Sequence, residues 1–382
     1  MLKKEITFIY MDKSEEQNFK PIYNEAINRG YKAKFTTNKF ERCNIGFYCQ
    51  HNNFPQFSKF SVIMLHDIIQ GYSRWPDIWF LEPWDKYDIG ILPGKQWTEM
   101  WEYSSRFFYA KTQKGVYEVG WPKSDVVNDI DVDETKKELT VRYNYDPDKP
   151  TVLYAPAWEN DGKQDEFVKA MLDLDVNILV KQAAVNPDIF PEQFSNIEAM
   201  KLLHKDIDRV IILDPSTNII NAISVSDILV SEESSTMCEA IMMGIPAISV
   251  SNWLIPDVTP SRFPKNDYPF VIKTQKENLS DSVTEVIRNY KQHKDFALNY
   301  SRRNFANIGS ASKIIMDIID SYVEEKQPQI KPLKPNKTDQ KLDCKTYIRH
   351  MLNRFKIEIV HNYSVNNKLI KMLYKIYRMT KI

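Results

Sequence analysis

Cysteine is scarce in this chain of 382 residues, which contains only Cys43, Cys49, Cys238 and Cys344. Their spacing fits neither a zinc site nor a Cys-x-x-Cys redox pair, so we predict four reduced thiols and no cysteine-based metal centre. No stretch reaches the roughly 18 apolar residues of a transmembrane helix. Acidic residues directly follow the short apolar run near the N-terminus, which argues against a signal peptide. These absences favour a cytoplasmic protein.

The chain has no net charge, because 51 Lys and Arg balance 51 Asp and Glu. The balance is uneven along the sequence: residues 331–382 carry 13 basic and three acidic side chains, and the first 330 residues are correspondingly acidic. An acidic body without a known nucleic-acid motif excludes nucleic acid as the expected partner. A Ser hydrolase is disfavoured because the sequence has no Gly-x-Ser-x-Gly elbow.

Short apolar runs alternate with helical patterns through residues 1–148, and this alternation predicts a parallel sheet with helices on its faces. The predicted strands are Ile6–Met11, Lys32–Thr37, Ile45–Cys49, Ser61–Leu65, Tyr87–Leu92 and Val116–Val119, and the predicted helices are Ser14–Asn28 and Asp129–Thr140. We interpret residues 1–148 as a Rossmann-like, acceptor-binding domain. The polar, turn-rich segment Asn144–Pro150 is the predicted linker to the next domain.

The same alternation starts again after the linker. The predicted strands are Thr151–Ala155, Asn177–Lys181, Val210–Leu213, Asp227–Ser231 and Ala247–Val250, and the predicted helices are Gln164–Leu172, Ile197–Lys205, Thr217–Val225 and Thr236–Met243. Residues 149–326 thus form a second Rossmann-like domain, whose helical end, Phe296–Glu325, should pack back toward the first domain. Two doubly wound α/β domains predict the glycosyltransferase-B (GT-B) architecture, with a ligand in the cleft beyond the carboxyl ends of the strands.

Residues 327–382 differ in composition from the body. Gln327–Lys341 is rich in proline and lysine and is typical of an extended linker. Beyond it, apolar residues recur at helical spacing with Lys and Arg between them, which predicts basic amphipathic helices that lie on an anionic membrane surface. Docking on the body, a contact in a homo-oligomer and a solvated tail are the alternatives.

The segment Asp227–Val250 is the most informative one. The apolar run Ile228–Val230 is followed by hydroxyl residues, a helix from Thr236, a stop at Gly244 and a second strand. A hydroxyl-rich helix N-terminus after a buried strand favours binding of a phosphate. The local alternative is a capping box formed by Thr236 and Glu239.

Five segments resemble, in the same order, motifs of the CDP-glycerol glycerophosphotransferase family, and all fall within residues 60–320. They are VIMLHD, with His66; VYEVGWPKSD, with Gly120, Pro122 and Asp125; TVLYAPAWEN, with Trp158; SEESSTMCEAIMMGIPAISV, with Ser234 and Ser235; and NIGSASKIIMDII, with Gly309. The resemblance implies a transferase of the teichoic-acid or capsule type. It would move glycerol phosphate, or a related group, from CDP-glycerol or another nucleotide-activated donor to a cell-surface polysaccharide or teichoic-acid-type acceptor.

The resemblance also implies a location and a cofactor requirement. A lipid-linked or glycan acceptor is expected on the inner face of the cell membrane, where the tail at 331–382 would hold the enzyme. No cofactor is required beyond the CDP-activated donor, with Mg²⁺ on the diphosphate left open, and no metal ligands are assigned.

His66 is the candidate general base, because it ends an apolar strand and its pKa lies near working pH. Asp67 is assigned to the catalytic site with it, either orienting His66 or contacting the acceptor. A hydrogen-bonded structural histidine is the alternative reading of His66.

The remaining candidates bind the donor. Ser234, Ser235 and Thr236 are expected to hold the diphosphate at the helix N-terminus, with Lys181 adding positive charge and Gln182 beside it. Glu239 is placed to accept from a ribose hydroxyl, and Trp158 to stack on the base or, alternatively, to pack in the core.

The sequence departs from the family pattern at specific positions, and these departures keep other functions open. Gln182 and Ala183 stand where the family has a second histidine, and Glu159 stands where it has an arginine. One alternative is a nucleotide-sugar glycosyltransferase or a UDP-N-acetylglucosamine 2-epimerase-like enzyme, which the Glu239-Ala240 pair and Gly244-Ile245-Pro246 would also fit. The other is a catalytically vestigial scaffold of a glycan assembly complex.

Overall fold

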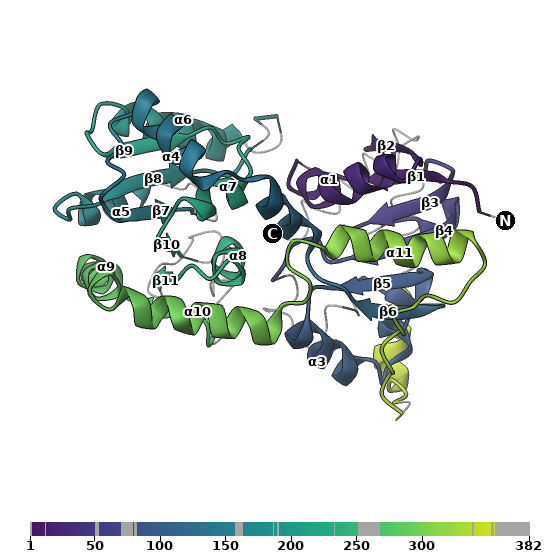
Figure 1. The fold of residues 1–382 in the computed structure, drawn as a ribbon. Helices are drawn as coiled ribbons and strands as arrows, with labels where there is room; N and C mark the ends of the chain where they lie inside the picture. The colour runs from purple at the N-terminus through teal and green to yellow at the C-terminus, as the bar shows by residue number, and fades with distance from the viewer. Residues whose placement is uncertain are drawn as a thin grey trace.

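The computed structural model describes residues 2–352 and 355, apart from 12, 50–52, 70–78, 80–81, 157–162, 186, 189–190, 233, 251–267 and 338–339. Two lobes, each built on one sheet, make up the chain (Figure 1). Each sheet has six strands and all of its pairings are parallel. The predicted α/β class, with two doubly wound sheets, is confirmed.

The first sheet has the strand order β2-β1-β3-β4-β5-β6. Its strands are β1 (Glu5–Ile9), β2 (Lys32–Thr36), β3 (Cys43–Tyr48), β4 (Ser58–Met64), β5 (Ile89–Leu92) and β6 (Gly115–Glu118). The central strands are buried along most of their length, as parallel strands covered on both faces must be, whereas the edge strand β2 is partly exposed. The strand order reverses between β1 and β3, and ligands of such sheets bind beyond the carboxyl ends of the strands at that point.

Helices and short 3₁₀ helices (η) connect and cover these strands. They are α1 (Lys13–Asn28), η1 (Pro55–Phe57), η3 (Trp84–Lys86), α3 (Lys95–Ser104), η4 (Phe108–Ala110) and η5 (Pro122–Asp129). Helix α1 follows β1 directly, so its first turn lies at the carboxyl end of the sheet, beside the residues that follow β4.

The second sheet has the order β12-β11-β10-β7-β8-β9. Its strands are β7 (Thr151–Tyr154), β8 (Asn177–Lys181), β9 (Val210–Leu213), β10 (Ile228–Ser231), β11 (Ala247–Val250) and β12 (Ile272–Thr274). The strand order reverses between β7 and β10. This switch point places the residues that follow β10, from Glu232 to Thr236, where a ligand of this sheet is expected.

The second lobe contains α5 (Lys163–Met171), α6 (Pro191–His204), α7 (Ile219–Ser224), α8 (Thr236–Met242), η6 (Lys276–Asn278) and α9 (Leu279–Arg288). Helix α4 (Val132–Arg142) begins after Asp131, whose side chain accepts a hydrogen bond from the Glu134 amide at 2.9 Å. In Figure 1 α4 lies with the second lobe, so the chain passes between the lobes before α4. The predicted linker Asn144–Pro150 joins α4 to β7, and the domain boundary at residue 148 stays a prediction.

The chain returns to the first lobe through two helices, as predicted for 296–325. Helix α10 (Tyr290–Asn304) contacts α8 and α3, and α11 (Ala311–Val323) lies against α1 and η5 (Figure 1). Arg29 at the end of α1 donates to Asp317 and Asp320 of α11 at 2.6 and 2.8 Å. The second half of the sequence therefore completes the cover of the first sheet.

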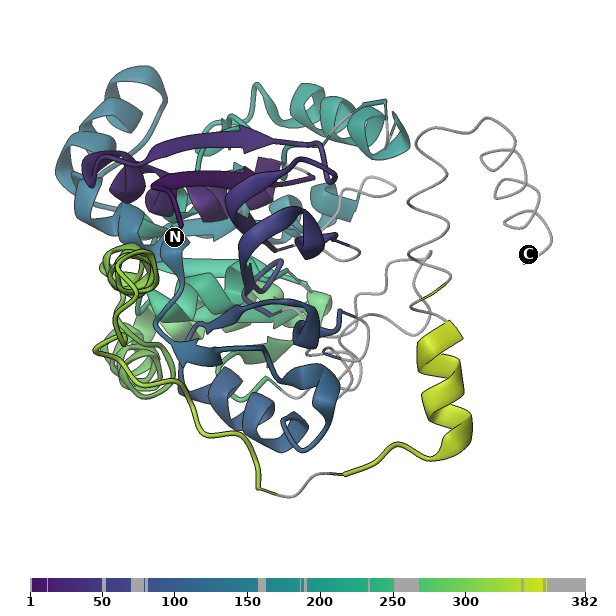
Figure 2. The ribbon, with the colours of Figure 1, turned by 90° about the vertical axis from the view of Figure 1, so that its right-hand side faces the viewer.

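The segment after α11 runs along the open edge of the first sheet. The Leu333 amide donates to the Val116 carbonyl of edge strand β6 at 2.7 Å, and the Gln340 amide donates to the Arg106 carbonyl at 2.8 Å. The predicted linker is thus extended but hydrogen-bonded to the body. A helix follows at residues 344–352, at the side of the molecule in Figure 2.

Candidate donor and catalytic site

His66 follows β4 at the carboxyl end of the first sheet, and its ring is held by α1. Its Nδ1 lies 2.7 Å from Oε1 of Glu15, and the Glu15 side chain is completely buried. The other Glu15 oxygen accepts from the Met11 amide at 2.6 Å, and Asn18 Nδ2 donates to the His66 carbonyl at 2.9 Å. The first turn of α1 therefore fixes both the ring and the backbone of the predicted base.

Asp67 shapes the loop after His66. Its Oδ1 accepts from the Ile69 amide at 2.8 Å, the geometry of an Asx turn. Burial raises the pKa of the Cys238 thiol in α8, and the carboxylates of Glu239 and Asp67 raise it further. The Asp67 carboxylate therefore lies within electrostatic range of the Cys238 thiol in the second lobe.

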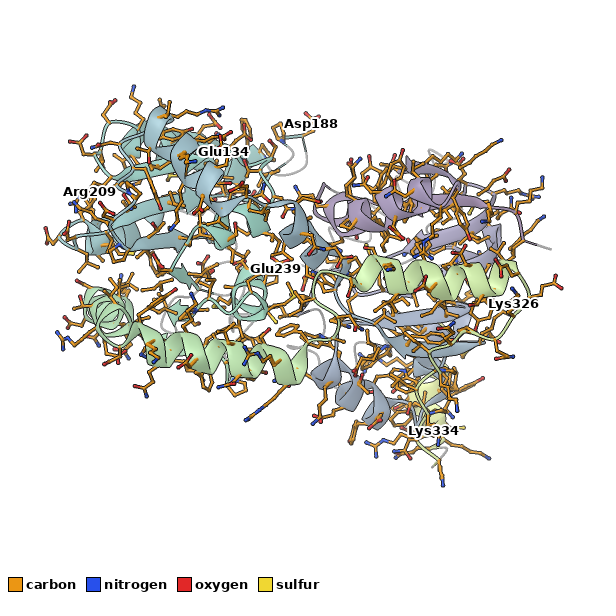
Figure 3. The ribbon with its side chains drawn as sticks, in the orientation of Figure 1. Glu134, Asp188, Arg209, Glu239, Lys326 and Lys334 are labelled. Atoms are coloured by element: carbon orange, nitrogen blue, oxygen red, sulfur yellow. The ribbon has the colours of Figure 1, made fainter. Side chains whose placement is uncertain are left out.

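Glu239 lies in α8 and is bound to Lys123 of η5. The Lys123 Nζ is 2.8 Å from Glu239 Oε1, and the two side chains are only 10% and 4% exposed. Figure 3 shows Glu239 where the two lobes meet. The capping-box reading of Thr236 and Glu239 is wrong, because the N-cap residue of α8 is Ser235, which makes no side-chain capping bond, and the Glu239 carboxylate turns to Lys123 instead.

The hydroxyl cluster after β10 is hydrogen-bonded within itself. Ser234 Oγ accepts from the Thr236 amide at 3.3 Å and from Thr236 Oγ1 at 2.9 Å. Ser234 is mostly buried, and Ser235 is half-buried. The diphosphate-binding role assigned to Ser234, Ser235 and Thr236 stays a prediction, on a helix of seven residues.

Lys181 ends β8 and points its ammonium group at backbone oxygens. Its Nζ donates to the carbonyls of Gln182 and Pro215 at 2.7 and 2.8 Å. Burial lowers the pKa of Lys181 to about 8; Lys123 lowers it further, whereas Asp214 and Glu239 oppose the shift. Lys181 therefore lies within electrostatic reach of the Lys123–Glu239 pair and loses its charge at a much lower pH than an exposed lysine. Gln182 is buried beside it.

The structure adds two residues to the predicted site. Trp158 lies outside the described residues, so its predicted role is unchanged. Glu15 and Lys123 were not identified from the sequence. Lys123 had a signal, because it occupies the arginine position of the family's Gly-Tyr-Pro-Arg-x-Asp motif; Glu15 had none, because it is 51 residues from the His66 that it binds.

Other residues of the family-like motifs are structural. Asp125 accepts from the amides of Ala311 and Ser312 at 2.9 and 2.6 Å and so caps the N-terminus of α11. Gly120 has φ +113°, and a Cβ there would lie 2.5 Å from the Ala306 carbonyl oxygen. These motif positions join η5 to the returning helices.

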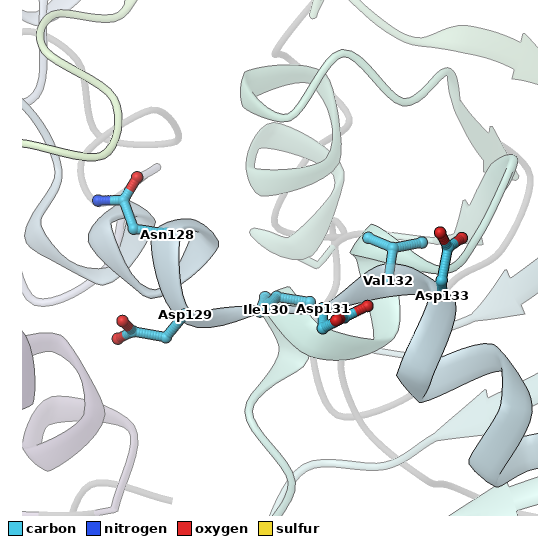
Figure 4. A pocket seen from close by; sticks show the side chains of 6 residues that line it. All are labelled: Asn128, Asp129, Ile130, Asp131, Val132 and Asp133. Carbon is cyan, nitrogen blue, oxygen red and sulfur yellow. The ribbon is translucent and has the colours of Figure 1, made fainter.

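An open pocket of about 410 Å³ lies along the segment between the lobes, lined by residues 128–133 (Figure 4). None of the predicted site residues lines it. Asp131 caps α4, and the side chains of Asp129 and Asp133 point in different directions in Figure 4. Among the described residues, no three His, Cys, Asp or Glu side chains are grouped to hold a metal ion.

The fold and the placement of charged residues between two facing parallel sheets define a two-domain α/β protein of the GT-B class. Residues 71–250 match the family model described as CDP-glycerol:poly(glycerophosphate) glycerophosphotransferase. The predicted resemblance to that family, which is a family of transferases, is confirmed. The match contains Lys123, Lys181 and the α8 segment, whereas His66 precedes it.

Solved structures share the fold over most of the chain. The wall teichoic acid polymerase TagF is 16% identical, with a TM-score of 0.57 over 85% of this chain and 90% of that chain. A putative UDP-N-acetylglucosamine 2-epimerase from Listeria monocytogenes is 14% identical, with a TM-score of 0.56 over 87% of this chain and 100% of its own. MnaA of S. aureus, solved with UDP, is 15% identical, with a TM-score of 0.57 over 86% of this chain and 100% of its own. No curated protein sequence matches this chain.

Proposed function

We propose that this protein transfers glycerol phosphate, or a related group, from CDP-glycerol or another nucleotide-activated donor to a teichoic-acid-type or other cell-surface polysaccharide acceptor. The observation that carries the proposal is the match of residues 71–250 to a glycerophosphotransferase family, together with the fold of TagF. The epimerase structures match the fold equally well, so the fold alone does not favour the transferase. The match to the family model favours the transferase over the epimerase.

The proposed chemistry assigns one role to each side of the site. The acceptor hydroxyl loses its proton to His66, and its oxygen forms a bond to the phosphorus that carries glycerol. The anhydride bond breaks, and the leaving group is CMP. Lys181, Lys123 and the hydroxyls of Ser234–Thr236 balance the negative charge of the two phosphates, while Glu239 exchanges its bond to Lys123 for a ribose hydroxyl.

We further propose that the enzyme works at the inner face of the cell membrane. The helix at 344–352 and Phe355 expose apolar side chains to solvent: Tyr347 46%, Ile348 55%, Met351 42%, Leu352 61% and Phe355 62%. Lys345 and Arg349 are exposed on the same helix. An apolar face flanked by basic residues fits an anionic lipid surface, on which a lipid-linked acceptor would reside. Among the described helices, none is both long and apolar enough to cross a membrane.

A panel of nucleotides tests the donor assignment. Thermal unfolding is measured with CDP, UDP, GDP, CDP-glycerol and UDP-N-acetylglucosamine, each also with Mg²⁺. A ligand at 100 times its Kd adds about 2.7 kcal/mol to the free energy of unfolding. We expect the largest rise in Tm with CDP-glycerol, and no rise with any nucleotide would contradict the proposal.

The alternative functions give different results in the same preparation. An epimerase converts UDP-N-acetylglucosamine without any acceptor, so product analysis with that donor alone identifies it. A vestigial scaffold is favoured by Gln182 and Ala183 at the position of the family's second histidine. It would turn over none of the donors, with or without an acceptor.

A further inference from the structure

We propose that Glu15 is the positioning residue of His66: its buried carboxylate fixes the imidazole with a proton on Nδ1 and thereby makes Nε2 the nitrogen that receives the acceptor's proton. This inference rests on the proposed function, in which His66 is the base. It assigns a role to a residue outside the matched family segment, on a different element from the histidine.

The contact between Glu15 and His66 determines which ring nitrogen carries the proton. The 2.7 Å separation of Glu15 Oε1 and His66 Nδ1 is typical of a charge-assisted hydrogen bond. An ionised carboxylate has only acceptor positions, so Nδ1 must donate. In the neutral ring the lone pair is then on Nε2, the nitrogen that can act as a base.

The first turn of α1 holds both the Glu15 carboxylate and the backbone of His66 in place. The Glu15 carboxylate is held by the Met11 amide at its other oxygen, and Asn18, one turn further along α1, binds the backbone of His66. Gln17 of the same turn reaches the Ser216 carbonyl in the second lobe at 3.4 Å. The turn that holds His66 therefore also touches the loop whose Pro215 carbonyl binds Lys181. Such a fixed arrangement is what a proton acceptor needs in order to meet its substrate.

Other charged groups lie near the Glu15–His66 pair. From the β2–β3 connection, half-buried Lys39 has a pKa lowered by burial, and Glu15 and Glu82 act in the opposite direction. Asp67 lies on the loop of His66, and its carboxylate raises the pKa of the buried Cys238 thiol in α8. All of these groups are unchanged in a Glu15 variant, so a change in the behaviour of His66 reports on the Glu15 carboxylate.

A purely structural role for Glu15 makes a different prediction from a positioning role. The substitution Glu15→Gln keeps the size and one acceptor oxygen of the side chain but removes its charge, and the new amide can turn to donate to the ring. A structural contact tolerates this change. A positioning contact does not, because the imidazolium loses its partner and the neutral ring can take the other tautomer. In the Ser-His-Asp triad the corresponding loss of charge costs about 10⁴ in kcat.

The test uses nitrogen NMR of ¹⁵N-histidine-labelled full-length protein, with the His66 signals assigned by their absence in His66→Ala. In the wild type we expect the proton of the neutral ring on Nδ1. In Glu15→Gln we expect the titration midpoint of His66 to fall by about one pH unit or more, since an adjacent opposite charge shifts a pKa by that amount. Glu16→Gln, the same change in the same helical turn, should leave the midpoint in place.

Two results would overturn the inference: a wild-type ring protonated on Nε2, or a midpoint that Glu15→Gln does not move. The first needs no variant, so it decides the matter even if Glu15→Gln fails to fold. In an active enzyme, the acidic limb of the kcat/KM profile must move to lower pH with the midpoint, and an unmoved limb also contradicts the positioning role. The NMR experiment needs no donor, so a failure of the proposed function is seen separately, as absent turnover in the wild type.

Discussion

Lys123 and Glu239, 116 residues apart in the sequence, form a buried ion pair of 2.8 Å between η5 and α8. The pair links the segment that leaves the first lobe to the helix that follows the switch point of the second sheet. A buried charge without its partner is costly, so the two residues depend on each other.

Removing one member of the pair should destabilise the protein strongly. We expect Lys123→Met or Glu239→Gln to lower the free energy of unfolding by about 3–5 kcal/mol, the cost of leaving a buried charge unpaired. The double variant should recover part of that loss. Urea unfolding followed by both fluorescence and circular dichroism measures it, and Lys95→Met, in the exposed Lys95–Glu99 pair, is the control that should change nothing. Additive single effects would show that the pair is not coupled.

Donor affinity should depend on the protonation of Lys181. Its pKa of about 8 means that it carries a charge below that pH and loses it as the pH rises through that value. If the ammonium group attracts the donor phosphates, the Kd for CDP should rise between pH 7.5 and 9.5. Lys181→Arg stays charged throughout this range and should bind with a flat pH profile. Calorimetric titration at several pH values compares the two proteins, and a flat profile for the wild type would remove Lys181 from the donor site.

Asp125 should matter for stability rather than for chemistry. It caps α11 through the amides of Ala311 and Ser312, so Asp125→Ala should lower the free energy of unfolding by about 0.5–2 kcal/mol. The Kd for CDP should not change. Asp133→Ala, which removes an exposed carboxylate nearby, is the matched control. A large loss of donor affinity with unchanged stability would instead place Asp125 in the site.

Membrane binding should depend on the exposed face of the helix at 344–352. Truncation is a poor test, because removing residues 333–340 uncovers the edge of β6. Substitution keeps the edge covered: Ile348→Ser with Leu352→Ser should reduce flotation with anionic vesicles at all salt concentrations. Lys345→Gln with Arg349→Gln should remove mainly the salt-sensitive part, at about 1 kcal/mol for each charge.

The matched control for flotation is Leu202→Ser with Leu203→Ser, which removes two exposed leucines from α6 on the second lobe. It should float like the wild type. If the helix variants float as well as this control, the helix face does not bind lipid, and a second copy of the chain becomes the better occupant. Neutral vesicles should recruit the wild type less than anionic ones.

Local patterns predicted most of the fold because they reflect burial directly. The central strands of both sheets are short apolar runs covered on two faces, and each run predicted as a strand became one. Strand β12 has only three residues, Ile272–Thr274, and was missed for that reason. Helix α4 starts at Val132 rather than at 129, because Asp131 supplies the cap. Such details depend on a single side-chain bond rather than on periodicity.

The site was less predictable because its contacts join distant parts of the chain. His66, Lys181 and Glu239 could be placed at strand or helix ends from local patterns. Their partners could not, since Glu15 meets His66 only when the first lobe has folded, and Lys123 meets Glu239 only when the two lobes come together. Local patterns therefore predicted a ribose contact or, alternatively, a capping box for Glu239, whereas in the folded chain it binds Lys123 of η5.

The central claim is that the protein transfers glycerol phosphate with His66 as the base, and one measurement tests it most directly. CMP release from CDP-glycerol is followed with a glycerol-phosphate-terminated lipid acceptor, in the wild type and in His66→Ala, and the Kd for donor is measured in both. The account predicts turnover by the wild type, a fall of roughly 10²–10⁴ in kcat for His66→Ala and a nearly unchanged donor Kd. Equal turnover by the two proteins would contradict the role of His66, and no turnover by the wild type would contradict the transferase itself.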